Sequence, residues 1–194
     1  MDGHIAERII QALTADPHVR RVLDAGCGNG NLSARLAAAG LQITGFDTST
    51  SGIEHARLAS PGLRFEVVSA YEDLRERFGN ELFDACACVE VIEHLYDPRA
   101  FVDRIYEVLR PGGLLVVTTP YHGYLKNLAL AVTGTMDSHY AALWDGGHIK
   151  FWSRATLTAL LEERGFRVIR FEGAGRVPLL WKSMIVTARK IATS

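Results

Sequence analysis

The chain has 194 residues, 48% of them hydrophobic, and a formal net charge of −1. This length suits one domain with a substantial core, and the scattered basic residues exclude the strong positive footprint of a dedicated nucleic-acid-binding protein. Neither a long apolar run nor a signal-peptide pattern is present, so we expect a cytoplasmic protein without a transmembrane segment; the sequence leaves its oligomeric state open.

Strand and helix signals alternate along most of the chain, which is typical of a parallel sheet with helices on both faces. Apolar runs predict strands at 21–26, 42–47, 64–69, 83–89, 114–119, 166–172 and 182–189. Helical periodicity predicts helices at 4–15, 31–39, 51–58, 71–78, 98–109 and 153–164. The Pro-Gly-Gly sequence at 111–113 is expected to separate the fifth helix from its following strand. We therefore predict one α/β domain over residues 1–194.

The first strand runs into a turn with three alternating glycines, Gly26, Gly28 and Gly30. Glycines let the backbone turn sharply and let a ligand touch the main chain, and the next helix directs free N–H groups toward it. Cys27 lies inside this turn, where a small side chain is needed. The G-x-G-x-G spacing differs from the G-x-G-x-x-G of dinucleotide folds, which argues against an NAD(P)-dependent reductase.

Two aspartates extend this candidate ligand site. Asp24 stands two residues before Gly26, where it would repel a diphosphate and attract an ammonium group. Asp47 ends the second strand, 17 residues after Gly30, where an acid can accept both hydroxyls of a ribose. Asp24 would bind an ammonium group, Asp47 a ribose and the helix N-terminus a carboxylate. A ligand with these three groups is an amino-acid nucleoside.

At the segments VLDAGCGNG and GFD the chain resembles the class I S-adenosylmethionine (SAM)-dependent methyltransferases. The resemblance implies a Rossmann-like, mostly parallel sheet of seven strands whose last strand is antiparallel. It implies SAM as the methyl donor and S-adenosylhomocysteine as the product. It also assigns cofactor contacts to Thr48 after the second strand, to Ala70 and Tyr71 after the third, and to Val89 at the end of the fourth. Ala70 stands where an acid often contacts the adenine amino group.

A second group of polar residues, Glu90, Glu93 and His94, follows the fourth strand. On a helical turn they would share one face, and the carboxyl ends of such strands border the ligand crevice. Three interpretations remain open: the residues bind a cation, the glutamates are stabilised by a helix N-terminus, or His94 is a general base without a metal.

This E-x-x-E-H pattern, followed later by Gly-Gly-His148, resembles two branches of the superfamily. These are the ubiquinone-biosynthesis O-methyltransferases and the methyltransferases of the terminal 2′-hydroxyl of small RNAs. The resemblance implies Glu90, Glu93, His94 and His148 as ligands of a divalent metal such as Mg, Mn or Zn. A bound divalent ion would lower the pKa of an acceptor hydroxyl and hold its oxygen near the methyl group.

Residues 121–150 lie between the fifth strand and the next helix, too long a stretch for a plain connector. We predict a lid inserted after strand 5 that covers the substrate, with apolar walls from residues such as Leu125, Leu128 and Trp144; an insertion that only packs on the sheet edge is the alternative. His122 at its start would border the acceptor, as a base or hydrogen-bond partner, and joins His94 and His148 as candidate catalytic residues.

The sequence as a whole favours a SAM-dependent methyltransferase that methylates oxygen on a small, partly apolar hydroxyl or phenol acceptor. N-methylation and carboxylate methylation stay open. Two alternatives remain: metal-dependent 2′-O-methylation of small RNA, and a regulator that binds SAM without catalysis. The near-neutral charge favours the small-molecule acceptor over RNA.

Overall fold

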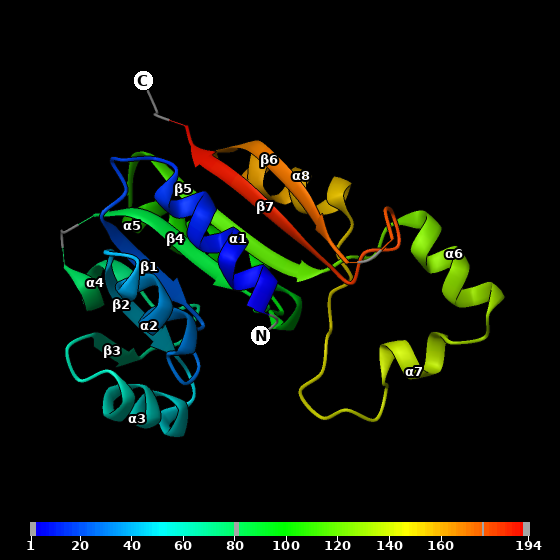
Figure 1. Cartoon of the computed structure of the whole chain (residues 1–194), viewed down its shortest axis with the longest axis horizontal. Helices are drawn as coiled ribbons and strands as arrows, with labels where there is room; N and C mark the ends of the chain where they lie inside the picture. The colour runs from blue at the N-terminus through cyan, green and yellow to red at the C-terminus, as the bar shows by residue number, and fades with distance from the viewer. Residues whose placement is uncertain (1–2, 80–81, 176, 192–194) are drawn as a thin grey trace.

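The sheet has seven strands in the order β3-β2-β1-β4-β5-β7-β6 (Figure 1). The computed structural model describes residues 3–79, 82–175 and 177–191. The strands are β1 (Arg21–Ala25), β2 (Gln42–Asp47), β3 (Arg64–Val67), β4 (Phe83–Val89), β5 (Leu109–Pro120), β6 (Phe166–Ala174) and β7 (Ser183–Lys190). The helices are α1 (Gly3–Thr14), α2 (Asn31–Ala38), α3 (Thr50–Ala59), α4 (Leu74–Phe78), α5 (Pro98–Val108), α6 (Tyr124–Val132), α7 (Met136–Tyr140) and α8 (Arg154–Glu163), with a 3-10 turn η1 (Ile92–His94).

Helices cover both faces of the sheet, as the alternating pattern predicted. Buried side chains of α4, α5 and α8 pack on one face, and those of α1 and α2 pack on the other. The first five strands pair in parallel, whereas β7 pairs antiparallel with both β5 and β6. The predicted Rossmann-like sheet with an antiparallel last strand is therefore confirmed. Consequently β1 to β5 end at the same edge, where a ligand crevice is expected.

Two predicted boundaries shift by more than two residues. The helix predicted at 71–78 begins at Leu74, because the Asp73 carboxylate caps it by accepting from the backbone N–H groups of Arg75 and Glu76. The strand predicted at 114–119 begins at Leu109, which pairs with Phe83 across a register shift. The Pro-Gly-Gly sequence thus lies within the irregular start of β5 and not before it, since its glycines accommodate the shift.

The insertion predicted at 121–150 contains α6 and α7, followed by a stretch without regular structure that leads to α8. Figure 1 shows both helices beyond the carboxyl end of β5 and the amino end of β7, away from the layers of the main body. We call residues 121–150 the lid. Across the described ranges, no helix combines the length and apolarity needed to cross a membrane. The cytoplasmic location stays a prediction.

Candidate functional site

The glycine turn after β1 needs glycine for two physical reasons. Gly26 and Gly30 both have φ of +76°, a left-handed conformation that favours glycine. A Cβ on Gly26 would collide with the Val91 side chain, and one on Gly30 would lie 2.9 Å from the Cβ of Ala56. The turn therefore packs tightly beneath its exposed face, and that face is free of side chains at Gly28.

Asp24 lies at the base of this turn and is only 1% exposed. The Ser33 hydroxyl donates to Asp24 Oδ2 at 2.6 Å, and no cationic side chain among the described residues pairs with the carboxylate. The pKa of Asp24 is raised to about 6: burial raises it most, the Ser33 hydrogen bond opposes this, and the negative charge of Asp47 adds a smaller increase. A buried carboxylate without a cation is a suitable partner for a ligand ammonium.

The second aspartate, Asp47, connects the glycine turn to the neighbouring strand. Its Oδ2 accepts from the Gly28 N–H at 2.8 Å and its Oδ1 accepts from the Ser49 N–H at 2.8 Å. Each carboxylate oxygen keeps a free lone pair, so the two oxygens can still accept hydrogen bonds from the two hydroxyls of a ribose. The backbone bonds hold the carboxylate in a fixed orientation beside Gly28.

A cavity of about 370 Å³ opens over the glycine turn. It is lined by Asp24, Gly26, Cys27, Gly28, Asn29, Asn31, Leu32, Val89 and Glu90. Asn29, Asn31 and Leu32 were not predicted, although their positions within the turn and the first helical turn were a sufficient signal. Val89, a predicted cofactor contact, also lines this cavity.

The remaining predicted cofactor residues, Thr48, Ala70 and Tyr71, lie outside this lining. They follow β2 and β3, and the sheet order places these strand ends successively farther from β1. The Tyr71 hydroxyl accepts from the Asp97 N–H at 3.2 Å. An elongated ligand that contacts all these strand ends would lie along the carboxyl edge of the sheet.

Replacement of Asp24 by asparagine is expected to stabilise the unliganded protein above pH 7. Because the native pKa is about 6 against 3.8 when unfolded, stability falls as pH rises through this window. The variant lacks this loss, so we expect it to exceed the wild type by up to ~3 kcal/mol at pH 7.5, from ~1.4 kcal/mol per pKa unit. Urea denaturation at pH 7.5 and pH 4 measures this; no gain at pH 7.5 would contradict it.

A separate cluster of donor atoms follows β4. One ligand atom from each of Glu93, His94 and His148 lies within 4.8 Å of the other two. Glu93 is 1% exposed; its Oε2 accepts from the Thr119 hydroxyl at 2.9 Å, whereas its buried Oε1 has no hydrogen-bond partner. His148 Nε2 lies 3.9 Å from this Oε1. Burial, and next the charge of Glu90, raise the pKa of Glu93 to about 8.

Backbone contacts orient the two histidines. His94 Nδ1 lies 3.1 Å from the carbonyl oxygen of Gly146, which suits donation from Nδ1 and leaves Nε2 with a free lone pair. The backbone N–H groups of Ile149 and Lys150 both donate to the Glu93 carbonyl oxygen, at 2.9 and 3.0 Å. These contacts attach the end of the lid to η1. Burial and the nearby His94 lower the pKa of His148, which favours the neutral form that binds metals.

Glu90 lies outside this three-residue group. Its Oε1 accepts from the Thr118 hydroxyl at 3.0 Å, and burial raises the pKa of its carboxyl. Its φ of 54° is a left-handed conformation that is uncommon for a side chain of this size and is characteristic of functional sites. The consecutive threonines Thr118 and Thr119, which hold Glu90 and Glu93, were missed by sequence reasoning. The polar pair at the end of an otherwise apolar strand was the available signal.

His122 lies at the start of the lid and not in the group of three. It is 6% exposed and its ring contacts those of His139, Tyr140 and Phe151, with the Tyr140 ring stacked at 5.7 Å. Burial, and next the charge of Lys126, lower the pKa of His122 to about 4, so the ring is neutral at pH 7. This aromatic cluster joins α7 to the end of β5.

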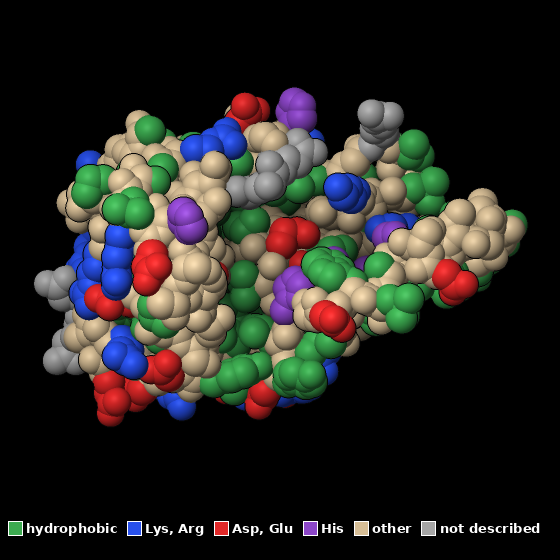
Figure 2. Space-filling model, turned by 90° about the horizontal axis from the view of Figure 1, so that it is seen from below, with side chains coloured by type: hydrophobic (Ala, Val, Ile, Leu, Met, Phe, Trp, Pro, Cys, Tyr) green, Lys and Arg blue, Asp and Glu red, His purple; other side chains and the backbone are tan. Residues whose placement is uncertain are grey.

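The apolar lid residues predicted as substrate walls are exposed in this structure, and their role as walls stays a prediction. Leu125, Leu128 and Trp144 are 47, 46 and 55% exposed, and none of them lines the 370 Å³ cavity. Trp144 instead packs edge-on against His94 and His148. Figure 2 looks onto a hollow between the main body and the lid, where acidic and histidine side chains are visible. On this face the basic side chains are interspersed with acidic ones.

Comparisons with known proteins agree with this geometry. Residues 1–170 match a family model described as a methyltransferase domain. A ubiquinone biosynthesis O-methyltransferase from Bradyrhizobium sp. (strain ORS 278) is 35% identical over 134 residues, 69% of this chain and 51% of that protein. The chain spans 47–65% of the length of the first curated relatives that it matches.

Two solved structures show the same fold. The methyltransferase domain of a bacterial protein named CtHen1-C has a TM-score of 0.74 and 25% identity, with 97% of each chain covered. Magnesium protoporphyrin IX methyltransferase from Synechocystis PCC 6803, solved with bound S-adenosylhomocysteine, has a TM-score of 0.73 and 21% identity, covering 96% of this chain and 82% of that one.

Proposed function

The chain belongs to the SAM-dependent methyltransferase family, and from that premise we propose that it methylates a hydroxyl oxygen on a small, partly apolar acceptor. The observation that carries the proposal is the placement of Asp24, the glycine turn and Asp47 along one sheet edge. This order matches the ammonium, the amino-acid chain and the ribose of SAM. The relatives named as ubiquinone biosynthesis O-methyltransferases support oxygen as the acceptor atom.

When bound, SAM supplies a methyl group on a sulfonium sulfur; its transfer breaks the carbon–sulfur bond, forms a carbon–oxygen bond and releases the hydroxyl proton. In the proposed complex, Asp24 pairs with the ammonium group, and its buried carboxylate keeps the charged form because the pair replaces lost hydration. Asp47 accepts from the ribose hydroxyls. Thr48, Ala70 and Tyr71 extend this contact toward the adenine, while Val89 and Cys27 pack against the ligand.

We also propose that Glu93, His94 and His148 hold a divalent cation. The unpartnered buried Oε1 of Glu93 fits this role, because a buried carboxylate oxygen otherwise lacks compensation for its lost hydration. Mixed carboxylate and imidazole ligands suit Mn or Zn better than Mg on affinity. When bound, such an ion lowers the pKa of an acceptor hydroxyl. Glu90 is retained as a candidate fourth ligand.

The lid would help to form this site. It contributes His148 directly, and its contacts with η1 hold Glu93 and His94 in position. His122 and its aromatic neighbours attach α7 to the main body, so His122 is proposed to position the lid. A direct role for this neutral ring as a base or as a hydrogen-bond partner of the substrate remains the alternative.

Thermal unfolding with three ligands tests the proposed cofactor. We expect S-adenosylhomocysteine and SAM to raise the melting temperature, because each binds only the folded state, and NADH to leave it unchanged. Calorimetric titration gives the affinities. A stabilising effect of NADH without one from either sulfur compound would overturn the proposal.

A second acceptor class is supported by one observation. Glu93, His94 and His148 lie together, and the E-x-x-E-H pattern with His148 resembles the small-RNA branch of the superfamily as well as the ubiquinone branch. Methylation of a 3′-terminal 2′-hydroxyl of small RNA is therefore the alternative function. A methyl-transfer assay with SAM as the donor, and with either a short RNA or a catechol as the acceptor, distinguishes the two classes.

A further inference from the structure

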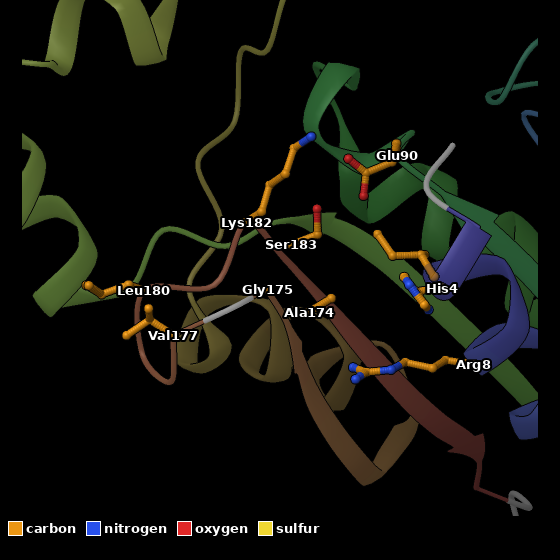
Figure 3. Close-up of a pocket in the computed structure, with 10 residues that line it drawn as sticks. His4, Arg8, Glu90, Ala174, Gly175, Val177, Leu180, Lys182 and Ser183 are labelled. Carbon is orange, nitrogen blue, oxygen red and sulfur yellow. The ribbon is translucent and has the colours of Figure 1, made fainter.

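A second cavity, of about 860 Å³, lies between the start of α1 and the segment that joins β6 to β7 (Figure 3). Its volume falls within the range of small-molecule sites. None of the residues predicted to bind the cofactor lines this cavity, whereas Glu90, a predicted metal ligand, does. The cofactor is therefore not expected to fill this cavity, and a different ligand would occupy it.

Glu90 lines both cavities, so the 860 Å³ cavity meets the cofactor cavity at this residue. A molecule bound in the larger cavity would thus lie next to the bound methyl donor. This is the position that a methyl acceptor requires, since the acceptor oxygen must reach the methyl group directly.

Two cationic side chains face the larger cavity from different elements. Figure 3 shows Arg8 on α1 and Lys182 just before β7 on separate walls. Among the described residues, the Lys182 ammonium makes no hydrogen bond or ion pair. Arg8 Nη1 donates to the Gly173 carbonyl oxygen at 3.0 Å, which holds the guanidinium in place and leaves its other N–H groups available.

Neighbouring residues strengthen this positive character. The buried Lys126 Nζ lies 3.5 Å from the carbonyl oxygen of Lys182; burial, and next the charge of Lys182, lower the pKa of Lys126. The acid in the described lining is Glu90, whose Oε1 accepts from Thr118 and whose pKa is raised by burial against the smaller, lowering effect of the charge of Lys182. In a chain of net charge −1, this concentration of positive charge is local.

The remaining walls are largely apolar. Ile5, Ala174, Val177 and Leu180 contribute hydrocarbon surface, and Val177 and Leu180 lie at the end of the cavity away from α1 in Figure 3. A site with hydrocarbon walls and unpaired cations is complementary to an amphiphilic anion.

We propose that the 860 Å³ cavity binds the methyl acceptor and that this acceptor carries an anionic group, a carboxylate or a phosphate, on an apolar framework. Lys182 and Arg8 pair with the anion, and the apolar walls contact the framework. The hydroxyl to be methylated then points toward Glu90 and the cofactor. This inference rests on the proposed methyltransferase function, because it takes the occupant to be the acceptor.

Two dyes of the same skeleton test the charge selection. 8-Anilinonaphthalene-1-sulfonate carries an anion, and N-phenyl-1-naphthylamine lacks it. With saturating S-adenosylhomocysteine present, we expect the wild type to bind the sulfonate dye, and Lys182→Met and Arg8→Met each to weaken it by about tenfold. Arg167→Met, an exposed charge change on β6, is the matched control and should leave the affinity unchanged. The neutral dye should bind all four proteins alike.

Competition then distinguishes the two anion classes. Benzoate and phenyl phosphate are titrated against the bound sulfonate dye, with benzyl alcohol as the neutral competitor. We expect at least one of the two anions to displace the dye and benzyl alcohol to leave it bound. The anion that displaces the dye at the lower concentration shows whether the site prefers a carboxylate or a phosphate. Equal displacement by benzyl alcohol, unchanged dye affinity in both variants, or no dye binding by the wild type would overturn the inference. Binding of S-adenosylhomocysteine, measured separately, shows whether the proposed function itself fails.

Discussion

Replacement of Asp47 by alanine should weaken the binding of S-adenosylhomocysteine by at least about tenfold in calorimetric titration. The change removes both carboxylate oxygens that would accept from the ribose hydroxyls. Hydrogen bonds to a charged acceptor are among the stronger ones in proteins, so the loss of two has a large effect. It also frees the Gly28 N–H, which Asp47 Oδ2 holds at 2.8 Å, and so loosens the glycine turn.

Ser49→Ala is the matched control for this experiment. Ser49 is adjacent to the same strand end, and its hydroxyl accepts from the Gly52 N–H at 3.0 Å as the cap of α3. Its loss should lower stability by ~1 kcal/mol and leave ligand affinity unchanged. Equal affinity of Asp47→Ala and the wild type would refute the ribose contact, and an equal loss in Ser49→Ala would show that only local order was disturbed.

Glu93→Gln should abolish the binding of one Mn²⁺ per chain, with a loss of affinity of about a hundredfold or more. An amide is a much poorer ligand than a carboxylate, and Glu93 supplies the buried oxygen that has no other partner. Titration calorimetry with Mn²⁺ and metal analysis after dialysis measure the effect. The variant keeps the size of the side chain, so packing beneath η1 is preserved.

Two further variants sharpen the metal experiment. Glu90→Gln should weaken Mn²⁺ binding less than Glu93→Gln does, because Thr118 already holds the Glu90 carboxylate and Glu90 lies outside the group of three. Glu163→Gln on α8 is the control for a general loss of negative charge and should leave the affinity unchanged. Absence of Mn²⁺ and Zn²⁺ binding by the wild type, after soaking in each ion, would remove the metal from the mechanism.

Local rules account for most of the fold that could be predicted. Asn31 begins α2 directly after Gly30, as expected from a glycine that permits the left-handed turn. The helix opening at Pro98 follows the same logic, since proline fits the first helical turn. The lid was recognised as an insertion by its length alone. Its two helices were not predicted, because short exposed helices carry little periodic signal.

In the candidate site, too, some features depend on local sequence and others on tertiary packing. The sequence by itself determined the cofactor turn, because the positive φ values and the strand-to-helix connection depend on residues that are adjacent in the chain. The resemblance already grouped His148 with Glu93 and His94. Only the tertiary structure decided that Glu90 accepts a hydrogen bond from Thr118 outside that group, and that His122 packs among the aromatic rings of the lid. It alone placed Arg8 and Lys182 in the walls of one cavity, since the relative position of segments so far apart depends on how the sheet and its covering helices pack, and packing leaves no local pattern in the chain.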